Sequence, residues 1–305
     1  MPKRSKISQE RLAQLNTENA VYTISCFDQE YDCLDHHHQA CSRGFFSLFL
    51  QAIQGAQFAA SLEIPFFVDF GNLSYPYSEP LKFNNDPNFW NYFFIQKPLP
   101  PKKKSILNSK FENYPLKVWS KSFTIKLNQT YTSLFQPKQE LQSAFDEITK
   151  LFSDNSILGV HYRKTDHFNE VTPVNENKIF QLIDRKLPAF DRLFLATDDQ
   201  DVIQDFEKKY ADKLFYHPCT RSSGNQAIHS QKLQNGFDLG KEALLDCFAL
   251  SQCKHAILSP SNLSFSTLVF NPYLSYSLAE SKQAKWKRLK TLLLYYLDVL
   301  GIRKW

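Results

Sequence analysis

The stretch GVHYRKTDHF at residues 159–168 contains the feature that decides the fold. It continues an apolar run that starts at Ile157, and a short apolar run of this kind is typical of a strand buried on both faces. The run ends abruptly in a group of polar and charged side chains, namely His161, Arg163, Lys164 and Asp166. In open parallel sheets ligands bind beyond the carboxyl ends of the strands, so the stretch predicts both such a sheet and a place for a ligand.

Short apolar strands and helices alternate on both sides of this stretch. The predicted strands cover residues 156–163, 192–199, 213–217 and 255–261. The predicted helices cover residues 137–152, 175–187, 200–210 and 238–253. This alternation is typical of a parallel, doubly wound sheet, in which each helix crosses over one face of the sheet.

A second α/β layer is predicted in the amino-terminal half. Strands at 21–27 and 65–71 flank a helix at 44–64, whose apolar residues recur at helical spacing. Residues 96–137 include KPLPPKKK and several prolines, so we expect a long surface excursion with little regular structure there. The last helix, at 284–300, is expected to pack back across both layers.

The chain is therefore expected to have an α/β fold of two Rossmann-like domains that face a cleft. With 305 residues it is long enough for two domains. The expected boundaries are 20–145 for the amino-terminal domain, 146–282 for the carboxyl-terminal domain and 283–305 for the last helix. A cleft between two such domains is a natural ligand site.

Composition indicates the cellular location of the protein more clearly than its function. The net charge of +5 is mild for this length and is compatible with an anionic small molecule or with nucleic acid. The six cysteines show no C-x-x-C spacing, which predicts reduced thiols and a cytoplasmic location. No stretch has the length and hydrophobicity of a signal peptide or a spanning helix, so no integral membrane segment is expected.

Two further predicted strands end in polar groups like those of the opening stretch. These groups are Asp198 and Asp199 at the end of one strand, and Ser259, Ser261 and Asn262 at the end of the other. Because the carboxyl ends of parallel strands meet at one edge of a sheet, we expect all three groups to lie together.

Arg163 is the centre of the site hypothesis. A guanidinium at a strand end can grip a phosphate through two parallel hydrogen bonds. With a sugar diphosphate as substrate, it would neutralise charge on the departing diphosphate without a metal. The alternative is an ion pair with Asp166 or Asp198 that only holds the loop.

The neighbouring serines and aspartates also have structural explanations. Ser261 or Asn262 can cap the following helix or, at the amino terminus of that helix, help to bind phosphate. Asp198 or Asp199 can begin a helix, or can orient Arg163 and bond a nucleotide ribose or base. The residues alone leave both alternatives open.

The amino-terminal half supplies candidates for the acceptor side. The segment DHHH at 35–38 lacks a spacing typical of zinc sites, so no metal is expected there. It follows the first predicted strand and is expected to face the cleft, where Asp35, His36 or His37 would contact an acceptor. Asp69, at the end of another predicted strand, is a candidate catalytic base.

Several motifs of other protein classes are absent from the sequence. It contains no G-x-x-x-x-G-K-[ST] phosphate loop, no G-x-G-x-x-G and no G-x-S-x-G nucleophile elbow. HYRKTD is not a kinase catalytic loop, because no D-F-G follows it and no glycine-rich loop precedes it. The basic residues are not interleaved with aromatics in a continuous stripe, so nucleic acid is not expected as a partner.

Three segments carry a resemblance to a known family. HYRKTD at 161–166 matches H-x-R-x-T-D, and FLATDDQDVIQDF at 194–206 and GKEALLDCFALSQCKHAILSPSNLSF at 240–265 are similar to a second and a third motif. In these segments the chain resembles the GDP-fucose-dependent fucosyltransferases. This group includes the core fucosyltransferases of glycoproteins, the bacterial nodulation-factor enzymes and, more distantly, the protein O-fucosyltransferases. The likeness covers residues 20–280 and is strongest across 157–270.

The resemblance implies a GT-B fold, with the donor mainly on the carboxyl-terminal domain, and an inverting, metal-independent transfer. By this resemblance Arg163 would hold the donor diphosphate, and Asp246 would bond the guanine. Lys164 stands where core fucosyltransferases have a second arginine, and it supplies charge without the planar fork. The remaining implied residues are His161 and Asp166 in the loop of Arg163, Asp198 and Asp199 near the nucleotide, and Ser259, Ser261 and Asn262 in the phosphate-side turn.

We therefore expect an enzyme that transfers fucose from GDP-fucose to a hydroxyl of a glycan or of a lipid- or protein-linked acceptor. The nucleotide sugar is then a substrate, and no cofactor is expected. Two alternatives are a related transferase that uses another nucleotide sugar, and a non-catalytic nucleotide- or glycan-binding module on the same fold.

Overall fold

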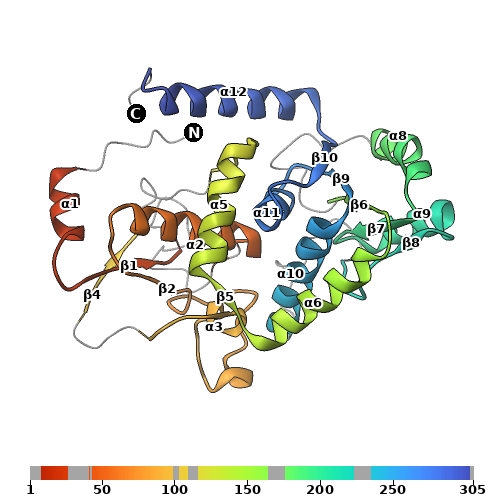
Figure 1. Ribbon diagram of the computed structural model, residues 1–305. Helices are drawn as coiled ribbons and strands as arrows, with labels where there is room; N and C mark the ends of the chain where they lie inside the picture. The colour runs from red at the N-terminus through yellow and green to blue at the C-terminus, as the bar shows by residue number, and fades with distance from the viewer. Residues whose placement is uncertain are drawn as a thin grey trace.

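The computed structural model describes residues 8–26, 41, 43–98, 103–108, 116–163, 176–222 and 235–302. Two parallel sheets, one of three and one of five strands, lie side by side with helices packed around them (Figure 1). The part of the chain described thus has the predicted α/β class and the two predicted layers.

The five-stranded sheet has the order β10-β9-β6-β7-β8, and all its pairs are parallel. β6, at its centre, is buried along its whole length, as the apolar run predicts. Four of the strands lie where the sequence predicts them, and β10 was not predicted. The strands are β6 (Ile157–His161), β7 (Arg192–Ala196), β8 (Leu214–Phe215), β9 (His255–Leu258) and β10 (Ser275–Leu278).

Helices cover both faces of this sheet because its side chains alternate between them. One face packs on α8 (Glu176–Lys186) and α9 (Gln200–Tyr210). The other packs on α6 (Gln139–Ser153) and α10 (Gly236–Gln252), which are the predicted helices of this region. Gly159 allows the close approach of α10 to β6, since a Cβ at this position would lie 2.6 Å from Cys253 Sγ.

The three-stranded sheet has the order β2-β1-β4. β1 (Ala20–Ile24) and β2 (Phe66–Val68) flank α2 (Phe45–Ser61) in sequence, as predicted. Smaller elements surround this sheet: α1 (Gln9–Leu15), the 3-10 turn η2 (Pro80–Phe83), α3 (Trp90–Phe93) and the antiparallel pair β3 (Phe94–Ile95) and β5 (Gln136–Pro137). A second 3-10 turn, η3 (Leu187–Ala189), follows α8.

The prediction of little regular structure across 96–137 is wrong for two segments. β4 (Lys104–Leu107) pairs in parallel with β1, and α5 (Lys121–Leu134) is a helix of 14 residues. α5 buries Phe123, Leu127 and Tyr131, which recur every four residues on one face. The prolines that suggested a loop lie outside both elements. They therefore do not interrupt the strand or the helix.

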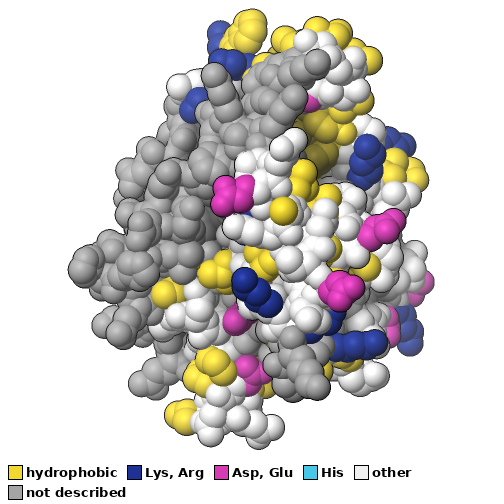
Figure 2. Space-filling model, turned by 90° about the vertical axis from the view of Figure 1, so that its left-hand side faces the viewer, with side chains coloured by type: hydrophobic (Ala, Val, Ile, Leu, Met, Phe, Trp, Pro, Cys, Tyr) yellow, Lys and Arg dark blue, Asp and Glu magenta, His cyan; other side chains and the backbone are white. Residues whose placement is uncertain are grey.

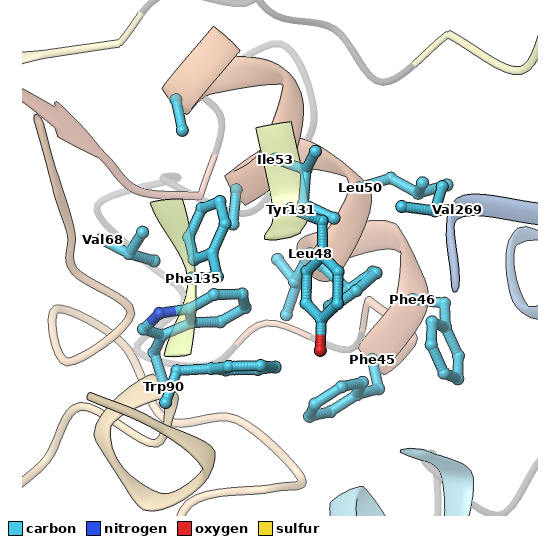
Figure 3. Close-up of a cluster of buried hydrophobic side chains, with 14 of the residues drawn as sticks. Phe45, Phe46, Leu48, Leu50, Ile53, Val68, Trp90, Tyr131, Phe135 and Val269 are labelled. Atoms are coloured by element: carbon cyan, nitrogen blue, oxygen red, sulfur yellow. The ribbon is translucent and has the colours of Figure 1, made fainter. Parts of the chain in front are cut away.

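One hydrophobic cluster joins the two sheets. It contains Tyr22 of β1 and Phe45 of α2 together with Leu244 of α10 and Phe265 of α11 (Asn262–Phe270). Figure 3 shows its centre, where the aromatic side chains of α2, α3 and α5 point toward one another. The amino- and carboxyl-terminal halves therefore share a core, and the domain boundaries expected from the sequence stay a prediction.

The start of α10 presses against the amino-terminal half through two glycines. A Cβ on Gly236 would lie 2.6 Å from the carbonyl oxygen of Pro76, and one on Gly240 would lie 2.6 Å from the ring of Phe93. The four-residue spacing puts both glycines on one face of the helix. α10 thus packs on the five-stranded sheet with its later turns and on the other half with its first turns.

The last helix, α12 (Lys282–Val299), runs across the top of the molecule (Figure 1). It packs back on the common core through Leu292 and Tyr295, as the sequence predicts for a terminal helix. Among the described residues, no helix combines the length and the apolar character needed to cross a membrane.

Candidate functional site

A cavity lies between the carboxyl edge of the five-stranded sheet and the start of α2. Its carboxyl-terminal wall comes from the ends of β6 and β7, from α10 and from the first turn of α11. Its amino-terminal wall is formed by Gly44, Phe45, Phe46, Ser47 and Tyr77. The polar strand ends of the sequence therefore meet at this cavity, where parallel sheets bind ligands.

Arg163 and Asp198 line the cavity from neighbouring strands. Arg163 follows β6 and is half-buried, and Asp198 follows β7. Hydrogen-bonded pairing of β6 with β7, with His161 opposite Ala196, brings the two strand ends together. Lys164 and Asp166, which the sequence also selects, lie outside the described residues, and their predicted roles stay predictions.

His161 is oriented by two serines. Ser264 Oγ donates its single hydrogen to the carbonyl oxygen of Ser259 at 2.6 Å, so it accepts from His161 Nδ1 at 2.7 Å. In the neutral ring the proton is therefore on Nδ1 and the lone pair on Nε2. His161 is only 5% exposed, and this bond fixes its ring at the cavity wall.

The turn into α11 presents a helix amino terminus to the cavity. Ser261 is the N-cap, because its Oγ accepts from Ser264 N at 3.0 Å. Ser261 and Asn262 both line the cavity, so capping and ligand contact occur in the same turn. Ser259 is 1% exposed and lies behind this turn, where its backbone N–H donates to the carbonyl of His161.

The two aspartates after β7 have different surroundings. Asp199 is the N-cap of α9: its Oδ1 accepts from Asp201 N at 2.8 Å and from Val202 N at 3.1 Å. It is 1% exposed and is not among the cavity residues. Asp198 lines the cavity, so the structure supports a capping role for Asp199, while a role of Asp198 in nucleotide binding stays a prediction.

Asp246 and Glu242 line the cavity from consecutive turns of α10. Asp246 Oδ1 lies 2.8 Å from His217 Nδ1, and Glu242 accepts a hydrogen bond from Thr220 N at 2.9 Å. The segment after β8 thus holds both carboxylates in place. Sequence reasoning selected Asp246 but missed Glu242, although the four-residue spacing on a predicted helix was a signal that could have found it.

Burial raises the pKa of two acidic groups in this wall. It raises the pKa of the Glu242 carboxyl above its ordinary value; Asp238 and Asp246 raise it further, while the hydrogen bonds from Thr220 lower it. Burial, and then the charge of Asp246, also raise the pKa of the Cys219 thiol, which lines the same wall. Cys219 is therefore expected to be a neutral thiol near pH 7.

The amino-terminal candidates are not brought to this cavity by the described structure. Asp69 is half-buried, and its Oδ1 accepts from Gly71 N at 2.9 Å within a local turn. It is absent from the cavity lining, so its role as a base stays a prediction. Asp35, His36 and His37 lie outside the described residues. In the part of the chain that is described, no group of three His, Cys, Asp or Glu side chains could hold a metal ion.

Comparison with solved structures connects this arrangement to known folds. NodZ alpha-1,6-fucosyltransferase, in a structure soaked with GDP-fucose, aligns with a TM-score of 0.54 at 14% identity, over 82% of this chain and 92% of that chain. Fucosyltransferase NodZ from Bradyrhizobium, in its selenomethionine form, aligns with a TM-score of 0.52 at 14% identity, over 86% and 97%. The chain has a GT-B-type fold. No family model matches the sequence.

Among the described residues of the cavity, the charged groups come from one side. Arg163, Asp198, Glu242 and Asp246 all belong to the carboxyl-terminal wall, which follows the strand ends of the five-stranded sheet. The amino-terminal wall contributes glycine, serine and aromatic residues. A ligand with an anionic and a hydrogen-bonding part would be held mainly by the first wall, and its remaining part would face the second.

Proposed function

We propose that the protein is an inverting, metal-independent glycosyltransferase that transfers fucose from GDP-fucose to a hydroxyl acceptor. The observation that carries the proposal is one cavity that combines a guanidinium, Arg163, with a helix amino terminus and a buried carboxylate, Asp246. A diphosphate needs the first two groups, and a guanine base suits the third. The NodZ structures that share the fold support this donor, since one of them was soaked with GDP-fucose.

Arg163 and the first turn of α11 are assigned to the diphosphate. A guanidinium binds two phosphate oxygens at once, and the free N–H groups of a helix start add partial positive charge. In the transfer, the bond from the sugar carbon to the diphosphate oxygen breaks while the acceptor oxygen bonds to the same carbon from the opposite face. The negative charge that develops on the leaving oxygen is stabilised by Arg163, and the hydroxyl proton of the acceptor passes to a water molecule.

Asp246 is assigned to the base of the nucleotide. A carboxylate only accepts hydrogen bonds, and the pairing edge of guanine offers two adjacent N–H donors. With Oδ1 held by His217, the carboxylate has a fixed orientation before the nucleotide arrives. Preorganisation of this kind raises affinity because little side-chain entropy is lost on binding.

The acceptor side is assigned to the neutral wall around Phe45 and Tyr77. Tyr77 Oη accepts from Phe45 N at 2.7 Å, which ties the start of α2 to the loop that carries Tyr77. An uncharged acceptor, such as a glycan alone or linked to a lipid or a protein, suits a wall whose described residues carry no charge. We place the reaction in the cytoplasm, in keeping with the cysteine pattern of the sequence.

A donor screen by thermal unfolding tests the proposal. GDP-fucose at saturating concentration is expected to raise the Tm on the order of 5 °C, GDP-mannose less, and UDP-sugars not at all. Products made with glycan acceptors would then be analysed by mass spectrometry for added deoxyhexose. A Tm increase with UDP-sugars alone would overturn the fucose donor, and binding of GDP-fucose without turnover on any acceptor would indicate a binding module.

A further inference from the structure

One face of α12 exposes a continuous line of large apolar side chains. Trp286, Leu289, Leu293, Tyr296 and Leu300 follow one another by three or four residues, which puts them on the same side of the helix. They are 75%, 40%, 60%, 43% and 69% exposed in that order. We call these five residues the apolar stripe. Singly exposed apolar residues are ordinary, whereas a contiguous line of five marks an interaction surface.

The opposite face of α12 is already occupied by the body of the protein. Leu292 and Tyr295 pack against the common core, and the Tyr295 ring lies 5.4 Å from that of Phe123. Arg288 on the same face forms an ion pair with Glu280, with 2.7 Å between Nη2 and Oε1. The helix is therefore held in a fixed orientation. Trp286, Leu289, Leu293 and Leu300 face outward, whereas the Tyr296 hydroxyl lies 3.2 Å from Ser120 Oγ and only the rest of its ring is exposed.

Positive charge flanks the first half of the apolar stripe. α12 contains five basic residues and one acidic residue, Asp298. Apart from Arg288, the basic residues are the exposed Lys282, Lys285, Lys287 and Lys290. Lys282 lies in line with the stripe at its start, and Lys285 and Lys290 flank it on either side by their spacing. Lysine can lay its aliphatic stem along apolar groups while its ammonium reaches outward.

The apolar stripe and its neighbouring lysines together favour one kind of binding surface over another. A second copy with its α12 parallel to this one would bring four exposed lysines against these four, and like charges would oppose the contact. In an antiparallel arrangement the other helix would offer a single carboxylate, Asp298, to the four lysines. An anionic lipid surface instead matches both features, because phosphates pair with the lysines while Trp286 and the leucines enter the region between headgroups and acyl chains. Apolar side chains also gather at the top of the molecule, where α12 lies, in the view of Figure 2.

We propose that α12 docks the protein on the surface of a bilayer that contains anionic phospholipids. The helix lies parallel to the surface, with the apolar stripe inserted and the lysines at the headgroups. The inference does not depend on the proposed transferase activity. It concerns a face that is distinct from the cavity, so either conclusion can fail without the other.

Vesicle flotation of the full chain tests the inference. Phosphatidylcholine vesicles with and without phosphatidylglycerol are mixed with the protein, and bound protein is measured in the floated fraction at low and high salt. The expected result is binding to the vesicles with phosphatidylglycerol, which weakens as salt screens the lysines. Equal binding to both vesicle types, or none to either, would overturn the inference.

Two variants separate insertion from charge. Trp286→Ser combined with Leu293→Ser is expected to abolish flotation, and replacing Lys285, Lys287 and Lys290 by Gln is expected to weaken it on the order of 100-fold. Leu81→Ser is the matched control, since Leu81 is 90% exposed on a different element. Circular dichroism and Tm verify that each variant is folded. Dimers in light scattering without vesicles, lost on Trp286→Ser, would assign the stripe to a second copy and contradict the proposal.

Discussion

The two walls of the cavity differ in charge and in origin. The carboxyl-terminal wall follows the ends of buried parallel strands and carries Arg163, Asp198 and Asp246. The amino-terminal wall is the start of α2 and the loop of Tyr77, and it carries no charged side chain among the described cavity residues. For the proposed anionic donor, the difference predicts that recognition is concentrated in one half. Substitutions in the carboxyl-terminal wall should therefore change donor binding and turnover. Substitutions at the contact between the halves should instead change the free energy of unfolding.

The largest effect is expected from removing the guanidinium. Arg163→Ala should lower kcat about 100- to 1000-fold, because the leaving diphosphate loses its positive partner. Arg163→Lys should retain part of the activity, since charge remains without the planar fork. Steady-state transfer assays with a saturating donor measure both variants.

The control for Arg163 is Arg192→Ala. Arg192 begins β7, at the opposite edge of the same sheet, with its guanidinium 4.2 Å from the ring centroid of Phe215. Activity of this variant should stay close to that of the wild type. An Arg163→Ala enzyme as active as the Arg192→Ala enzyme would remove Arg163 from the mechanism.

A smaller effect, on the affinity for the nucleotide, is expected from replacing Asp246, the proposed partner of guanine. Asp246→Asn should raise the Kd for GDP about 10- to 100-fold, because one charged acceptor becomes an amide with a donor facing guanine donors. At saturating donor, kcat should change much less. Calorimetric titration with GDP gives the comparison with Asp238→Asn, on the same helix but paired with Lys82 at 3.7 Å outside the cavity. Equal affinities of the two variants would disprove the base contact.

Contact between the halves is tested by Gly236→Ala. The new methyl group would meet the carbonyl oxygen of Pro76 at 2.6 Å, and a backbone atom cannot move aside as a side-chain end can. The free energy of unfolding should fall by about 1–3 kcal/mol. Chemical denaturation measures it against Gly44→Ala, also at a helix start but with nothing within 4 Å of the added Cβ. A Gly236→Ala loss no larger than that of Gly44→Ala would show that the two halves are not tightly apposed there.

The smallest effect is expected far from the cavity, at His255. Burial, followed by the charge of Lys186, lowers the pKa of His255 to about 4, and both ring nitrogens lie within hydrogen-bonding distance of serines of β10. The unfolded state binds this proton more readily, so stability is full above pH 6.5 and is lost as the pH falls toward 4. His255→Gln should have a flatter Tm between pH 7 and pH 4.5 than the wild type. If the Tm of the wild type and that of His255→Gln change equally with pH, the lowered pKa of His255 is contradicted.

Much of the carboxyl-terminal half was predictable because its strands are continuous apolar runs that end in polar residues. That pattern located β6, β7 and β9, and the rule for ligands at strand ends selected Arg163 and Asp198, which the structure places in one cavity. Asp246 came from the family resemblance, since one carboxylate in a helix carries no local signal.

The rest depends on contacts that no local pattern encodes. Glu242, His217 and Thr220 come together only because the segment after β8 folds against α10. α5 was missed because the prolines around it outweighed a four-residue apolar spacing in a helix of otherwise polar residues. Asp199 caps α9, whereas Asp198 lines the cavity. The sequence alone does not show which of two adjacent aspartates will cap the helix.

The paired glycines of α10 have a consequence for how such a protein can diversify. Because the backbone near Pro76 and the Phe93 ring sit where a side chain would otherwise be, the two halves cannot be exchanged independently as modules. Replacing the whole first sheet by that of a relative would require the same backbone path to within a fraction of an ångström. For the proposed transferase, a change of acceptor is therefore expected to be tolerated better in loops at the rim of the cavity than at the contact of α10 with the other half.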